Sequence, residues 1–242
     1  MIPISDQVYG VSIADVSGKG PGAALLMANL QASLHALVAG AMGISDMVGR
    51  INHLIHQNTD LDKYITFFYG QLDLRGHTFT YCNAGHNPPY KVSRDGRAIE
   101  LMAGGIVLGM MDGLHFETAT TVLKPGDLIV MYTDGITEAV NAEDEEFGEA
   151  RVLELVRKSQ DRTAQQLVDD LVSSVKTYFG NAPQADDITV VVIRALDRKE
   201  TGSPAGGAAP PEKGADKTEK AGKAKGKPDA AKKIRPAKRP EE

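Results

Sequence analysis

Two segments in the first quarter of the chain carry apolar residues at helical spacing, and each predicts an amphipathic helix. The first follows a glycine-rich turn near residue 20, and the second covers residues 44–55. The apolar positions that define them are Leu26, Leu30, Leu34, Leu37, Ile44, Met47, Val48, Ile51, Leu54 and Ile55. Two further helices are expected near the other end, over Glu149–Lys158 and from Thr163, where Thr163 and Gln166 have the spacing of a capping box.

The remaining apolar runs are short and rich in β-branched and aromatic residues, which predicts strands. Val8–Ala14 is one such run, and residues 64–92 hold several, with turns expected at Gly76 and at Asp95-Gly96. Another strand closes at Asp134-Gly135, and the last, "DDITVVVIRAL", is so continuously apolar that burial on both faces is expected. Because strands arrive in hairpins instead of alternating with helices, the predicted fold class is α+β.

Composition divides the chain into two regions. Residues 201–242 hold 11 of the 27 Lys and Arg and 6 of the 32 Asp and Glu, and Ile234 is their only large apolar residue. Such a segment buries too little surface to offset its ordering entropy. We therefore expect a folded domain over residues 1–197 and a disordered basic tail rich in Lys, Ala and Pro over residues 198–242.

Charge and cysteine content narrow the functional classes. Without residues 201–242 the chain has a net charge of −10, which argues against specific nucleic-acid binding by the folded domain. The single cysteine, Cys82, rules out an internal disulfide and fits a reducing cytoplasm. No stretch reads as a membrane span or a secretory leader, so a cytoplasmic protein is expected.

Three acidic residues occupy the same local context, at the border of a predicted apolar strand. Asp15 ends the strand before "VSGKGPG", Asp134 ends another before Gly135, and Asp186-Asp187 opens the last one. One such aspartate is usually a turn former. Three of them gathered at one rim of a sheet would repel one another unless a cation neutralised them, and carboxylate oxygens suit Mg²⁺ or Mn²⁺. The pattern therefore favours a divalent-metal site.

Two other phosphate-binding motifs do not fit the sequence. A phosphate-binding P-loop would need Ser or Thr after Lys19, where the chain has Gly20. The dinucleotide fingerprint fails as well, because "GKGPGA" brings its third glycine one position early.

The order of several blocks resembles bacterial metal-dependent serine phosphatases of the protein phosphatase 2C superfamily, in the branch of sporulation stage II protein E and sigma-factor regulators. The blocks are "DVSGKGPGAALLMANL", "TFFYGQLD", "YCNAGHNPPY", "GGIVLGM", "LKPGDLIVMYTDGITEAVN" and "DDITVVVI". The resemblance implies two packed antiparallel sheets flanked by helix pairs, an α-β-β-α sandwich. It also implies hydrolysis of phosphoserine or phosphothreonine on a regulatory protein of the anti-sigma-factor-antagonist type.

The resemblance further implies that two Mn²⁺ or Mg²⁺ ions activate a water for in-line attack on phosphorus. By position, Asp15, Asp134 and Asp186 would be the catalytic metal ligands, with the Val16 carbonyl as a further ligand and Asp187 close by.

The match is incomplete at its start. Relatives carry a Gly-Gly-Asp strand about twenty residues before the "DVSG" block, and often a sensor domain upstream of it, and the sequence before Asp15 contains neither. An N-terminal edge strand and one metal-site carboxylate are therefore expected to be missing. This leaves an alternative function open, a catalytically impaired phosphatase-like module that docks a partner.

Overall fold

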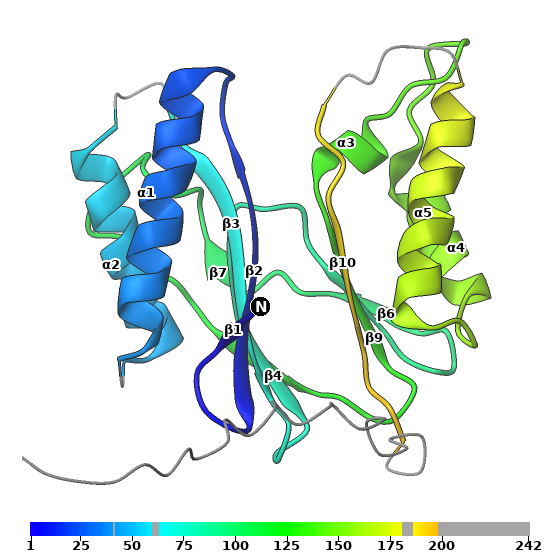
Figure 1. Ribbon diagram of the computed structural model, residues 1–242, viewed down its shortest axis with the longest axis horizontal. Helices are drawn as coiled ribbons and strands as arrows, with labels where there is room; N and C mark the ends of the chain where they lie inside the picture. Colours follow the sequence, from blue (N-terminus) through cyan, green and yellow to red (C-terminus); the bar gives the residue numbers. More distant parts are fainter. Residues whose placement is uncertain (41, 60–62, 181–185, 198–242) are drawn as a thin grey trace, which may run out of the picture. The chain divides into compact units, whose positions relative to one another are not determined.

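The computed structural model describes residues 1–40, 42–59, 63–180 and 186–197, and the predicted basic tail lies outside these ranges. Within them the chain forms two β-sheets that face each other, with helices on the outer side of each sheet (Figure 1). The helices are α1 (Pro21–Val38), α2 (Ile44–Gln57), α3 (Asp134–Thr137), α4 (Gly148–Lys158) and α5 (Ala164–Phe179). The strands are β1 (Ile2–Pro3), β2 (Val8–Val16), β3 (Ile65–Asp73), β4 (Thr78–Ala84), β5 (Tyr90–Val92), β6 (Ala98–Glu100), β7 (Gly104–Gly105), β8 (Ala119–Val122), β9 (Leu128–Tyr132) and β10 (Val190–Arg194).

The two sheets have different orders. The first sheet runs β1-β2-β3-β4-β7, with β8 also paired to β4, and the second runs β10-β9-β5-β6. All pairings between these named strands are antiparallel except that of β4 with β7. The predicted α+β sandwich with flanking helix pairs is therefore confirmed, with one parallel pairing added.

Three apolar layers hold the fold together. One lies between α1, α2 and the first sheet, and it includes the fully buried Ile51 and Ile65. A second lies between α4, α5 and the second sheet, with Leu171 and Val130 among its buried residues. The third lies between the sheets, where Phe68, Phe79 and Tyr81 stack with ring centroids 5.6–6.3 Å apart. Each sheet is thus covered on both faces.

Local sequence explains where the helices begin. Pro21 starts α1, a position that suits proline because no intrahelical partner is needed for its nitrogen. Thr163 and Gln166 form the predicted capping box at α5, with Gln166 N donating to Thr163 Oγ1 at 3.2 Å and Thr163 N donating to Gln166 Oε1 at 3.0 Å. These two signals were readable from the sequence.

The last strand is less deeply buried than its apolar sequence predicts. β10 lies at an edge of the second sheet and pairs only with β9 among the described strands, and all its residues are half-buried. Both faces are covered as predicted, with Val190 and Val192 packed on the helix side and Val191 and Ile193 packed between the sheets, but the burial is only partial. A continuous apolar run is also compatible with an edge strand whose inner face packs on the other sheet and whose outer face packs on a helix, here α5.

The first sheet has a short edge. β1 pairs only with Tyr9 and Gly10 of β2, so no described strand pairs with residues 11–16 on that side.

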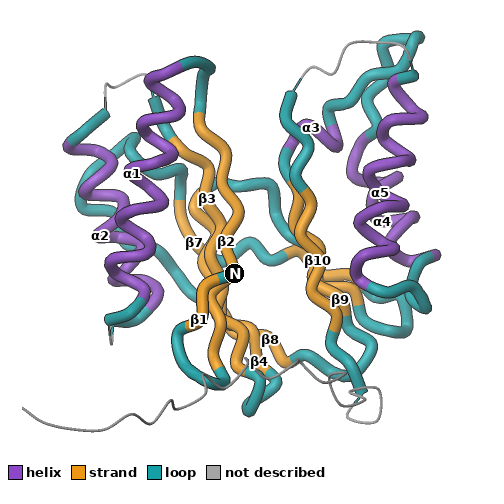
Figure 2. The backbone as a smooth tube through the Cα atoms, viewed as in Figure 1, coloured by secondary structure: helices purple, strands orange, loops and turns teal. Residues whose placement is uncertain are grey.

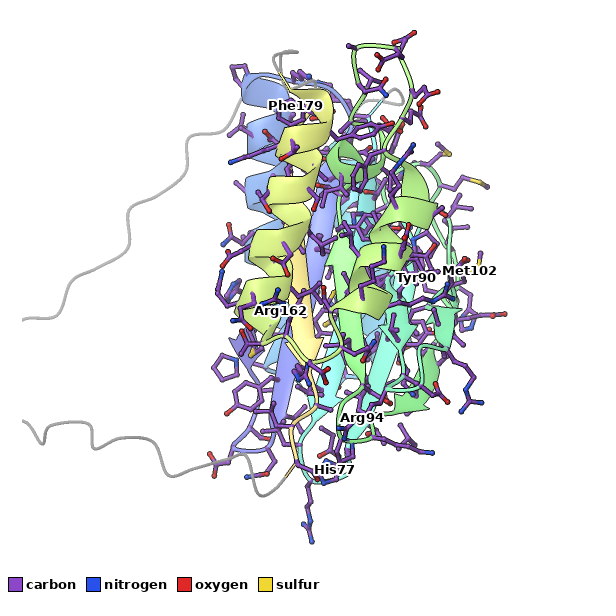
Figure 3. All side chains as sticks on the ribbon, turned by 90° about the vertical axis from the view of Figure 1, so that its right-hand side faces the viewer. His77, Tyr90, Arg94, Met102, Arg162 and Phe179 are labelled. Carbon is purple, nitrogen blue, oxygen red and sulfur yellow. The ribbon has the colours of Figure 1, made fainter. Side chains whose placement is uncertain are left out.

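The ends of the sandwich differ in what they carry. Figure 3 places Arg94 and His77, from two hairpin turns, at one end, and Phe179, the last residue of α5, at the other. The tube in Figure 2 shows that β2 leads into α1, and β9 into α3, at the end where α5 finishes. Asp15 and Asp134 therefore lie at this end. No helix within the described ranges combines the length and apolarity needed to cross a membrane.

Candidate metal centre

Asp15 lies on the first sheet, one residue before β2 ends. In the β2–β3 register it is opposite Thr66, and the neighbouring Val16 is opposite Ile65 and 8% exposed. After β2 the chain turns through Gly18 and Gly20, whose φ angles of 87° and 91° favour glycine, and enters α1. The turn is tied to β3 because Ser17 N donates to Tyr64 O at 3.0 Å and Tyr64 N donates to Ser17 Oγ at 2.9 Å.

Asp134 comes from the second sheet, at the first residue of α3 directly after β9. The preceding Thr133 is buried and joins this strand end to the start of the last strand. Its Oγ1 donates to Asp187 O at 2.9 Å and accepts from Thr189 N at 3.0 Å, and Thr133 N donates to Thr189 O at 3.1 Å. The backbone of residues 187–189 is therefore held against the Asp134 turn.

Gly135 allows that close approach. A Cβ atom built on Gly135 would lie 2.4 Å from Asp187 O and 3.3 Å from Asp186 C. No side chain fits in this space, so the aspartate pair can lie beside Asp134 only if residue 135 is glycine.

The carboxylates from the two sheets interact electrostatically. Burial raises the pKa of Asp15 from 3.8, the charges of Asp134, Asp186 and Asp187 raise it further, and the backbone N–H of Val16 opposes the rise. The structure thus brings all four predicted acids into one electrostatic neighbourhood. They do not share one rim of one sheet, as the sequence led us to expect, because Asp15 belongs to the first sheet and the others to the second.

An open cavity of about 610 Å³ lies at this place. Its lining combines acids from both sheets with the glycine turn and the first residues of α1: Asp15, Val16, Ser17, Gly18, Lys19, Gly20, Ala23, Ala24, Met27, Asp186 and Asp187. Lys19 is the cation in this lining. Gly20 occupies the N-cap position of α1 without a side-chain cap, and no acid occupies the first turn.

The predicted ligands are oxygen donors, the kind that a hard divalent cation prefers. Within residues 1–40, 42–59, 63–180 and 186–197, no three His, Cys, Asp or Glu side chains are gathered closely enough to hold an ion as they stand. The chemistry of the predicted ligands nevertheless fits Mg²⁺ or Mn²⁺. The nearby donors are carboxylate and carbonyl oxygens, and a cation would relieve the repulsion among the carboxylates. Mg²⁺ in particular keeps several waters and needs only one or two carboxylates.

Sequence reasoning missed three groups near these acids. His86 is 4% exposed, and the Asp134 charge acts on its ring. The pKa of Glu138 is raised by burial first and then by Asp134, Glu146 and Asp186. Lys19 was used only to reject a P-loop, although its place in "DVSGKG" is adjacent to the predicted ligands.

Comparison with known proteins gives a consistent picture. The family model described as Stage II sporulation protein E (SpoIIE) matches residues 5–196. The phosphoserine phosphatase RsbU of Bacillus subtilis is 31% identical over 185 residues, which are 76% of this chain and 55% of RsbU. Stage II sporulation protein E of the same organism is 24% identical, over 80% of this chain and 23% of its own length. The chain thus spans about half the length, or less, of these curated relatives.

Solved structures agree with the sandwich. The RsbU and RsbW domains of Rv1364c from Mycobacterium tuberculosis superpose with a TM-score of 0.65 at 26% identity, covering 78% of this chain and 52% of that one. The PP2C phosphatase domain of SpoIIE from B. subtilis, with a fragment of its regulatory domain, gives 0.68 at 23% identity, over 80% of this chain and 56% of that one. At that identity the second likeness supports the fold alone. Because the family model matches residues 5–196, nearly all of the described residues, the chain belongs to the Stage II sporulation protein E (SpoIIE) family.

Proposed function

We propose that this protein is a Mg²⁺- or Mn²⁺-dependent phosphatase that hydrolyses phosphoserine or phosphothreonine on a regulatory protein. One observation carries the proposal: Asp134, Asp186 and Asp187 of the second sheet all act on the Asp15 carboxylate of the first, and Asp15, Asp186 and Asp187 line one open cavity. The name of RsbU, a phosphoserine phosphatase, supports the same reaction class.

The acids and one carbonyl would hold the ions. Asp15, Asp134 and Asp186 are the proposed ligands, with the Val16 carbonyl beside Asp15 and Asp187 next to Asp186. Bound ions would supply a water acidic enough to attack phosphorus near pH 7 and would neutralise charge on the phosphoryl oxygens. RsbX, another structural neighbour, is described in complex with magnesium, which supports the choice of hard divalent cations.

The remaining cavity groups suit a phosphate. The N-terminus of α1 presents backbone N–H groups that have no side-chain cap and no acid in the first turn, an arrangement that attracts anions. Lys19 adds a positive charge on the same wall. Together they would orient the phosphoryl group toward the carboxylate-held ions and offset the acidic character of the cavity.

The substrate we propose is a phosphorylated anti-sigma-factor antagonist. The support is family membership and the names of relatives, which include RsbU, RsbP and a structure of RsbU and RsbW domains. We place the reaction in the cytoplasm, in agreement with a single, buried and reduced cysteine.

The test is phosphate release from phosphoserine and phosphothreonine proteins with Mn²⁺, with Mg²⁺ and with chelator. We expect metal-dependent release that Asp134→Asn lowers at least ~100-fold, as expected when an essential ligand is lost. Asp161→Asn is the matched control, because Asp161 is exposed in the turn between α4 and α5. Release that chelator leaves unchanged would refute the metal-dependent reaction.

A docking module without turnover is the second candidate function. The observation that favours it is that no three potential ligands are gathered as they stand within the described residues. Calorimetric titration with Mn²⁺ separates the two: saturable binding that Asp134→Asn removes supports the phosphatase, and no binding at millimolar Mn²⁺ supports docking.

A further inference from the structure

A second cavity, of about 450 Å³, lies at the end of the sandwich opposite the acids. Two turns form most of it, the β5–β6 turn over residues 93–97 and the β8–β9 turn over residues 123–127. Figure 3 shows Arg94, from the first of these turns, at the end opposite Phe179. The cavity is lined by Lys91, Ser93, Arg94, Asp95, Arg97, Ile99, Lys124, Pro125 and Asp127. Four cations and two acids give this lining a net charge of +2, whereas the chain without residues 201–242 carries −10.

Both acids of this cavity have partners. Asp127 is 3% exposed, and its Oδ2 lies 3.2 Å from Lys91 Nζ and accepts from Lys124 N at 3.0 Å. On the other turn, Asp95 Oδ2 lies 2.7 Å from Arg97 Nε, and Asp95 Oδ1 accepts from Arg97 N at 3.1 Å. Each carboxylate of the lining is therefore balanced by one cation.

The other two cations of the lining, Arg94 and Lys124, have exposed side chains. Neither side chain has a hydrogen bond or an ion pair with any residue that the structure describes. Their turns are in contact, because a Cβ atom built on Gly126 would lie 3.0 Å from Arg94 Cδ and 3.3 Å from Arg94 Cβ. The stem of Arg94 therefore lies on the turn that carries Lys124. Ser93, half-buried in the same lining, adds a neutral hydroxyl donor.

A guanidinium and an ammonium on adjoining turns suit a phosphate group. The guanidinium offers two parallel N–H donors to phosphate oxygens, and the ammonium adds a compact positive charge. A cavity of about 450 Å³ falls within the range of small-molecule sites, and Ile99 and Pro125 add exposed apolar surface to its wall. Residues 201–242 hold 11 basic and 6 acidic residues, so an anion from outside the chain suits the pocket better than this segment does.

We propose that this pocket binds a small phosphate-bearing anion, with Arg94 and Lys124 on the phosphate and with Ile99 and Pro125 beside any organic part. The pocket is separate from the acidic cavity, and the inference does not rest on the proposed phosphatase activity. Inorganic phosphate and an organic phosphate share the required chemistry, and their relative affinities decide which of them the pocket selects.

The test is an NMR titration of the ¹⁵N-labelled full chain, in chelator, with inorganic phosphate, with adenosine 5′-monophosphate and with adenosine. Chelator removes divalent ions, so the acidic cavity offers no bound cation to phosphate. We expect the backbone amide signals of the two turns to shift with both phosphates and not with adenosine, while those of residues 18–20 stay in place. Tighter binding of adenosine 5′-monophosphate would assign an organic phosphate, and equal affinities would assign the free ion. No shift in either turn at millimolar phosphate or nucleotide would overturn the proposal.

Neutral variants of the two cations test their part in binding. Arg94→Gln and Lys124→Gln should each weaken phosphate binding about 10-fold or more, because each removes a charged hydrogen-bond donor. Both side chains are exposed, so the melting temperatures should stay close to that of the wild type. Arg50→Gln, exposed on α2 and outside this lining, is the matched control and should bind phosphate like the wild type. Equal weakening in all three variants would indicate a general attraction to surface charge and would overturn the proposal.

Two further results would also contradict a phosphate pocket. Adenosine that binds as tightly as adenosine 5′-monophosphate would show that the phosphate is not recognised. A glutamate-rich peptide that shifts the signals of both turns, when neither phosphate does, would assign this basic surface to an acidic segment of a partner protein.

Discussion

The two strand ends that supply the candidate ligands are built in opposite ways. The turn after β2 is tied to Tyr64 at Ser17 but is open beyond it: a Cβ atom at Gly18 or Gly20 would meet no other atom, and α1 begins without a side-chain cap. The turn after β9, which begins with Asp134, is tight: Thr133 is bonded to two residues of the last strand segment, and Gly135 is in backbone contact with Asp187. The first turn leaves open space next to Asp15, and the second holds the backbone of residues 187–189 in place.

The two sheets therefore contribute to the site in different ways. The first sheet contributes one half-buried acid and an adaptable wall, and the second contributes the remaining acids from a backbone held by hydrogen bonds. Equivalent changes on the two sides test this difference.

Neutralising one ligand on each side should give the largest effects. Asp15→Asn and Asp134→Asn should each lower metal-dependent phosphate release at least ~100-fold. Asp15→Asn should also raise the melting temperature of the metal-free protein at pH 7, because burial and the neighbouring acids raise the pKa of Asp15 and so penalise its charged form in the folded state.

The rise in melting temperature caused by Asp15→Asn should depend on pH. The penalty on the Asp15 carboxylate is complete above its raised folded-state pKa and disappears as the pH falls toward the unfolded value of 3.8. The advantage of Asp15→Asn should therefore shrink in melting curves recorded from pH 7 down to pH 4. An advantage that grows on acidification would contradict the electrostatic cluster.

Adding a methyl group to a glycine on each side should separate the tight turn from the open one. Gly135→Ala places Cβ 2.4 Å from Asp187 O, so the backbone must move, at a cost of roughly 1–3 kcal/mol, and Mn²⁺ affinity should fall at least ~10-fold. Gly18→Ala meets no atom but is strained by its φ of 87°, at about 1–2 kcal/mol. Urea unfolding should show comparable losses, whereas calorimetry should show weakened Mn²⁺ binding only in Gly135→Ala.

Removing one hydroxyl on each side should give the smallest effects. Thr133→Val leaves Asp187 O and Thr189 N, the partners of two part-buried hydrogen bonds, unmet and should cost about 1–3 kcal/mol in urea unfolding. Ser17→Ala leaves only the Tyr64 N–H, which is exposed to water, and should cost about 0.5–1.5 kcal/mol. Equal losses would show that the two turns are equally constrained.

Much of this architecture was readable from local patterns. The capping box at Thr163 and the hairpin turn at Asp95-Gly96 both occur where the sequence placed them. These features depend on residues close together in the chain, so spacing and turn chemistry are enough to predict them.

What sequence could not supply depends on long-range pairing. The burial of β10 was overestimated because its edge position is set by which strand lies beside β9. The division of the acids between two sheets and the contact of His86 with Thr66 likewise result from pairing between distant segments. The assignment of Asp15, Val16, Asp134, Asp186 and Asp187 as ligands stays a prediction until metal binding is measured.

The division of the ligands between the sheets has a thermodynamic consequence. An ion shared by Asp15 and Asp134 would act as a cross-link at the end of the sandwich, beyond the aromatic layer that joins the sheets. Binding of the ion would then stabilise the contact between the two sheets. The stabilisation would grow with the logarithm of the free ion concentration once that concentration exceeds the dissociation constant. The supply of metal would in this way set the stability of the folded protein as well as its activity.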